Sequence, residues 1–131
     1  MNKFIYVFFV SLWLAPAAQA QMTISTDIVL VCDFEAMSGT FTNCVPLDNP
    51  AFFTIDGQNG WIKYTTGGKT EFFFIKRSWY DSDSALSNFD TESAKHERFI
   101  ISVGIATKIV AIMGTDKRGT FIMNHHIVDS W

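Results

Sequence analysis

Apolar and polar residues alternate along most of this chain, and a period of two is typical of β-strands that bury one face. The pattern is clearest in residues 98–105, 108–113 and 120–128, which we predict to be strands joined by turns at 106–107 and 114–119. Pairing through these turns brings one apolar group to a common face: Phe99, Ile101, Val103, Ile105, Val110, Ile112, Phe121 and Met123. A register error of one residue would scatter this group, so its coherence favours an antiparallel meander.

The two turns also predict which residues pair. Across the first turn, Val103 should lie beside Val110. Across the second, Met123 should lie beside Val110 and His125 opposite Lys108.

A further hairpin is predicted around Gly67-Gly68, which separates residues 61–66 from residues 69–79. A Gly-Gly pair is a strong signal for a two-residue loop, because both positions accept positive φ. This hairpin pairs Ile62 with Phe73, and both of its faces carry large apolar side chains.

The two cysteines, Cys32 and Cys44, are centred on a turn signal at Ser38-Gly39. If residues 27–35 and 40–45 are the arms of a hairpin, the cysteines face each other across it. Opposed residues in an antiparallel pair lie close enough for a disulfide to join them. We therefore predict a Cys32–Cys44 disulfide.

The remaining segments complete the predicted fold. Residues 51–56 form an expected strand after a connection bounded by Pro46 and Pro50, and Asp90 is placed to cap a short helix near residues 90–97. The elements together indicate an all-β fold. We expect a small antiparallel meander of about 7–8 strands, forming a β-sandwich or a closed or partly open barrel.

Residues 1–20 read as a cleaved secretory signal peptide. A positive start and an apolar run precede Ala18-Gln19-Ala20, a small-x-small cleavage pattern. Residue 21 is Gln, so a lipoprotein is not expected. We predict a single β domain over residues 21–131, secreted or periplasmic. The chain ends in Trp131, as outer-membrane proteins often do, but Asp129 and His125 break the apolar alternation, so no integral membrane span is expected after cleavage.

Composition excludes some partners. The chain is 48% hydrophobic with a net charge of −3, so it can bury a core but offers no basic surface for a nucleic acid.

No metal or cofactor site is expected. Asp81, Asp83 and Glu92 match the first, third and twelfth positions of a calcium-binding EF-hand loop. Ala85 and Leu86 then occupy the fifth and sixth positions, of which the sixth needs glycine, and a solvated acidic loop explains the carboxylates better.

The histidines and serines show no catalytic spacing. His125 and His126 are neighbours on a predicted strand and point to opposite faces, so they do not form a metal pair. We interpret both, and His96, as edge or surface residues. No nucleophile elbow or glycine-rich phosphate loop is present, and we do not expect an enzyme.

Aromatic side chains are the strongest candidates for binding. If exposed together they could stack on a sugar or grip another protein, whereas core packing is the alternative explanation. The candidates are Trp61, Tyr64, Phe72, Trp79 and Tyr80.

Two functions from different classes fit these observations. The first is an exported, non-catalytic β domain that binds a protein or a cell-envelope component such as a glycan. The second is a secreted small-ligand carrier or hydrolase with a pocket at the end of the sheet, and a concave site with converging polar groups would favour it. A purely structural envelope component is a third possibility, and identification of a binding partner would distinguish it from the first.

Overall fold

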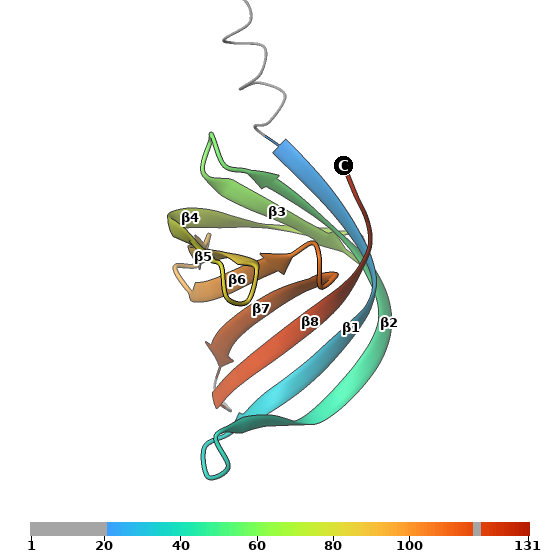
Figure 1. Cartoon of the computed structure of the whole chain (residues 1–131), viewed down its shortest axis with the longest axis vertical. Helices are drawn as coiled ribbons and strands as arrows, with labels where there is room; N and C mark the ends of the chain where they lie inside the picture. The colour runs from blue at the N-terminus through green and yellow to red at the C-terminus, as the bar shows by residue number, and fades with distance from the viewer. Residues whose placement is uncertain (1–20, 117–118) are drawn as a thin grey trace, which may run out of the picture.

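The computed structural model describes residues 21–116 and 119–131, so the predicted signal peptide lies outside the described residues. The strands form a closed antiparallel barrel in which each pairs with its neighbours in chain order and β8 pairs with β1 (Figure 1). This resolves the predicted all-β fold as a barrel of eight strands. The strands are β1 (Gln21–Glu35), β2 (Thr40–Asp56), β3 (Trp61–Thr66), β4 (Lys69–Asp81), β5 (Leu86–Ser93), β6 (Arg98–Gly104), β7 (Ile109–Asp116) and β8 (Gly119–Ser130).

The hydrophobic core fills the interior of the barrel. Alternate residues of each strand point inward, and those side chains pack into one cluster, as in other small barrels. The cluster contains Ile24, Ala51, Phe53, Ile62, Tyr64, Phe73, Ile101, Val103, Val110, Ile112 and Ile127.

Hairpin signals in the sequence locate several pairs correctly. Ile62 pairs with Phe73 across the Gly67-Gly68 loop, where both glycines have positive φ. Val103 pairs with Val110, as predicted.

The predicted register between β7 and β8 is wrong by two residues. Val110 pairs with His125, whereas we expected Met123 in that position. The strands continue to Asp116 and Gly119, so the connection is shorter than the sequence suggested. An even shift keeps the same side chains on the inner face, which is why the apolar face itself was predicted correctly.

The predicted helix near residues 90–97 is also wrong. β5 continues to Ser93 and pairs with both β4 and β6. Asp90 does not cap a helix but accepts hydrogen bonds from the Arg98 guanidinium at 2.8 and 2.6 Å. The strand ladders on both sides of β5 outweigh the local capping signal.

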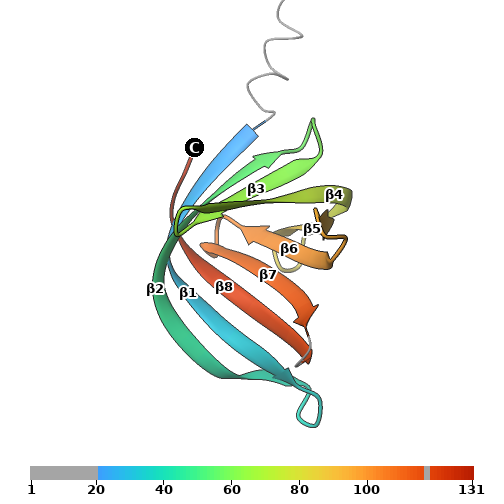
Figure 2. The same cartoon turned by 180° about the vertical axis from the view of Figure 1, so that it is seen from behind.

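Pro46 and Pro50 do not interrupt the chain as expected, because β2 runs through both. β1 pairs along β2 over most of its length, but β2 pairs with β3 only over residues 51–56. Residues 40–50 therefore lie at an edge of the sheet, where a residue without an N–H donor is tolerated. Figure 2 shows this part of the β1–β2 hairpin extending past the shorter strands.

The predicted disulfide joins this hairpin. Cys32 and Cys44, 12 residues apart, are bonded with a Cα–Cα distance of 4.1 Å. Such bonds persist in oxidising compartments, so the disulfide suggests a non-cytoplasmic environment.

Replacing both cysteines by serine should lower the free energy of unfolding by about 3 kcal/mol, because the unfolded chain then loses its closed loop. Urea denaturation of the Cys32→Ser, Cys44→Ser double variant beside the oxidised protein measures the difference. Equal midpoints for the two proteins would contradict the prediction.

Candidate functional site

A cavity of about 420 Å³ opens at the end of the barrel where β1 begins and β2, β4 and β6 end. Antiparallel up-and-down order brings these strand ends together, although they are far apart in the sequence. The volume lies within the range of roughly 300–1,000 Å³ found for small-molecule sites. The lining residues are Met22, Ile55, Gly57, Tyr80, Ala85, Ser87, Phe89, Val103, Ile105 and Ala106.

Small residues explain why this end of the barrel is hollow. Gly57, Ala85, Ser87 and Ala106 contribute little side-chain volume to the rim, so the layer above the core is left unfilled. Deeper in the cavity, the walls are large apolar side chains such as Phe89 that pack against the core.

Two hydroxyl groups give the cavity its polar character. Tyr80 on β4 pairs directly with Ser87 on β5, so both side chains lie on the inner side at the mouth. The Tyr80 side chain is 64% exposed and belongs to the rim. None of the described residues that line the cavity carries a charge.

The β2–β3 turn at the rim is held by Asp56. Its carboxylate accepts hydrogen bonds from the Asn59 side-chain amide and the Asn59 backbone N–H, both at 2.9 Å, and from the Gln21 amide at 3.2 Å. These hydrogen bonds, chiefly those from Asn59, lower the pKa of Asp56 and keep its carboxylate charged.

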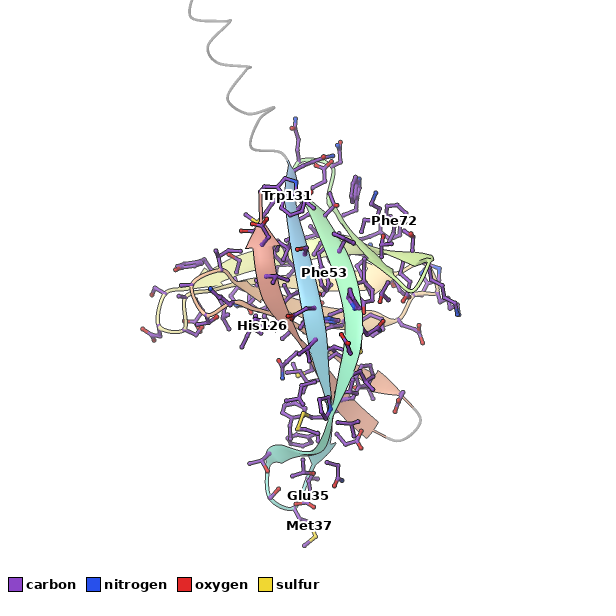
Figure 3. All side chains as sticks on the ribbon, turned by 90° about the vertical axis from the view of Figure 1, so that its right-hand side faces the viewer. Glu35, Met37, Phe53, Phe72, His126 and Trp131 are labelled. Carbon is purple, nitrogen blue, oxygen red and sulfur yellow. A yellow bond between two sulfur atoms is a disulfide. The ribbon has the colours of Figure 1, made fainter. Side chains whose placement is uncertain are left out.

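Only one of the predicted aromatic binding residues lines the cavity, and it is Tyr80. Tyr64 is buried in the core, which removes it from any exposed surface. Trp61 and Phe72 contact each other on the outer face, edge to face at 5.6 Å. Trp79 points outward, with the Arg77 guanidinium 4.7 Å from its ring. These candidate residues therefore do not form one continuous surface. In Figure 3, Phe72 lies to the side of the core residue Phe53, which is near the centre of the view.

His125 lies inside the barrel, which corrects its interpretation as an edge or surface residue. It is fully buried and pairs with Val110 and Val29 on the neighbouring strands. Its ring contacts those of Phe53 and Tyr64 at 5.1 and 5.5 Å. Neither ring nitrogen has a hydrogen-bond partner, and burial lowers its pKa to about 4.

The calcium-loop positions separate in the structure. The Asp81 carboxylate accepts a hydrogen bond from the Asp83 backbone N–H at 3.0 Å, which forms a local turn. Glu92 lies on β5 and pairs with the Lys76 ammonium at 3.3 Å. Within residues 21–116 and 119–131, no group of three or more His, Cys, Asp or Glu side chains is arranged to hold a metal ion.

The fold and this cavity define a small closed barrel with one accessible apolar end. Comparison with family models, with curated proteins and with solved structures finds no match. Among the described residues, no helix is long and apolar enough to cross a membrane.

Proposed function

We propose that this protein is an exported, non-catalytic binding protein that holds a small, mainly apolar ligand in the open end of its barrel. The observation that carries this proposal is the cavity of about 420 Å³ at the barrel mouth. Its apolar walls would remove ligand surface from water, which is the main source of affinity in such sites. The Tyr80 and Ser87 hydroxyls would fix the ligand's orientation. Of the two roles in our second hypothesis, this proposal keeps the small-ligand carrier and leaves out the hydrolase.

The disulfide supports the exported part of the proposal. A bond between Cys32 and Cys44 persists in a secreted or periplasmic protein, where thiols are not kept reduced. The signal peptide predicted over residues 1–20 would deliver the chain there, and N-terminal sequencing of the exported protein would test cleavage before Gln21.

Filling the cavity should weaken ligand binding strongly. The neutral apolar dye N-phenyl-1-naphthylamine should fluoresce more strongly with the purified protein, and Ala106→Trp should weaken its binding at least tenfold. Ala106 is an exposed turn residue that lines the cavity, so the indole can occupy the mouth with little cost to folding.

A matched control is available at the other end of the barrel. Ala94 is also an exposed turn residue, and Ala94→Trp adds the same bulk away from the cavity. Dye binding should survive Ala94→Trp. Equal loss of binding in both variants, or no loss in either, would contradict the proposed site.

One observation favours a second candidate function, the binding of a protein or envelope glycan. Phe52, Phe72 and Phe74 are 50%, 40% and 44% exposed on the outer face of β2 and β4. Apolar side chains gathered on a surface often mark a contact site. This candidate has less support than the cavity, because the Trp61 and Phe72 rings are inclined at 78° and do not form a flat platform for a sugar.

A further inference from the structure

We infer that the ligand of the barrel mouth is a cationic amphiphile, with an alkyl tail inside the cavity and an ammonium group at the rim. This inference rests on the proposed function and specifies the chemistry of its ligand. Three features of the mouth carry it: an apolar interior, two exposed carboxylates beside the rim (Asp81 and Asp83), and the exposed aromatic ring of Tyr80 next to them.

The interior of the cavity selects an apolar tail. Ile55, Phe89 and Val103 line it and belong to or pack against the hydrophobic core. No charged side chain among the described lining residues could pair with a ligand charge at depth. A buried, unpaired charge would be costly, so the charged end of a ligand must remain at the rim.

The charges around the rim are mainly negative. Asp81 directly follows Tyr80 and Asp83 lies in the adjoining β4–β5 turn, and both are exposed. Asp56 does not contribute to the open rim, because it is buried and its oxygens accept hydrogen bonds from Asn59 and Gln21. Among the described turns at this end of the barrel, the β6–β7 turn contributes one positive charge, that of Lys108. Carboxylates beside a low-dielectric cavity attract a cation and repel an anion.

Tyr80 offers a second interaction for a cation. Its exposed ring stands at the mouth, and an ammonium group within reach of an aromatic face is attracted by the ring quadrupole. Arg77 lies over the ring of Trp79, which points to the opposite face of β4 from Tyr80. The rim thus combines an aromatic face with nearby carboxylates, an arrangement suited to alkylammonium groups.

Three probes with the same tail test the inference. Decylamine and decanoate, each below its micelle concentration, and decanol, below its solubility limit, are titrated into the purified protein by calorimetry at pH 7 and low salt. Decylamine should bind about tenfold tighter than decanoate, with decanol between them.

Two double variants test whether the carboxylates beside the rim cause the preference for decylamine over decanoate. Asp81→Asn with Asp83→Asn should reduce the preference for decylamine over decanoate and leave decanol binding unchanged. The control Glu35→Gln with Asp48→Asn removes the same charge from exposed positions on the extended β1–β2 hairpin, and it should preserve the preference.

The possible failures are distinguishable. Decanoate binding as tightly as decylamine, or a preference that persists in the Asp81, Asp83 variant, would overturn the inference and leave the proposed function standing. Failure of all three probes and of the neutral dye to bind would overturn the proposed function itself.

Discussion

Replacing Phe53 by alanine should lower the free energy of unfolding by about 4 kcal/mol, because the truncation opens a cavity in a closely packed interior. Phe53 is fully buried and pairs with Ile24 on one side and Tyr64 on the other. Its ring stacks on that of Tyr64 at 4.8 Å and meets the edge of His125 at 5.1 Å. Its contacts therefore reach β1, β3 and β8.

The neighbouring residue provides the control. Phe52 is half exposed on the outer face of the same strand, and Phe52→Ala should cost less than about 1 kcal/mol. Urea denaturation of both variants compares the two faces directly. A larger loss for Phe52→Ala than for Phe53→Ala would mean that the strand has the opposite face inward.

Acidification from pH 7 to pH 5 should destabilise the protein by about 2 kcal/mol through His125 alone. Burial lowers the pKa of this histidine from 6.5 to about 4 in the folded protein. Below pH 6.5 the unfolded chain therefore binds a proton that the folded protein does not, and stability falls as the pH falls. The loss levels off below the folded pKa of about 4.

Substitution at His125 should remove this pH dependence. His125→Leu replaces the unpartnered imidazole by an apolar side chain of similar size, and its unfolding free energy should change much less between pH 7 and pH 5. The adjacent His126 is exposed and contacts Asp27 outside the barrel, so the destabilisation caused by His125 between pH 7 and pH 5 should persist in the His126→Gln control. A His125→Leu variant with the slope of the unsubstituted protein would rule out this explanation.

The strands and several registers could be predicted from the sequence because turn residues determine local pairing. Gly114 shows where this reasoning fails. It suggested a turn, but it lies within β7, where a Cβ atom would come within 2.6 Å of the Phe99 ring and 3.1 Å of the Phe121 ring. A glycine required by ring packing and a glycine required by a turn look the same in a sequence.

The placement of His125 was within reach of the sequence, whereas the cavity was not. Strict alternation with Phe121, Met123 and Ile127 indicates an inward histidine, but its polar character outweighed that signal. Met22 pairs with Ile55 within the β1–β2 hairpin, but only barrel closure brings this pair near the end of β6. No local pattern encodes that juxtaposition.

Amide NMR shifts on titration with N-phenyl-1-naphthylamine test most directly whether the barrel mouth is the binding site. The structure predicts perturbations confined to the mouth, at Met22, Ile55, Gly57, Ser87, Phe89, Val103 and Ala106. Perturbations centred instead on Phe52, Phe72 and Phe74 would place binding on the outer face and contradict the account.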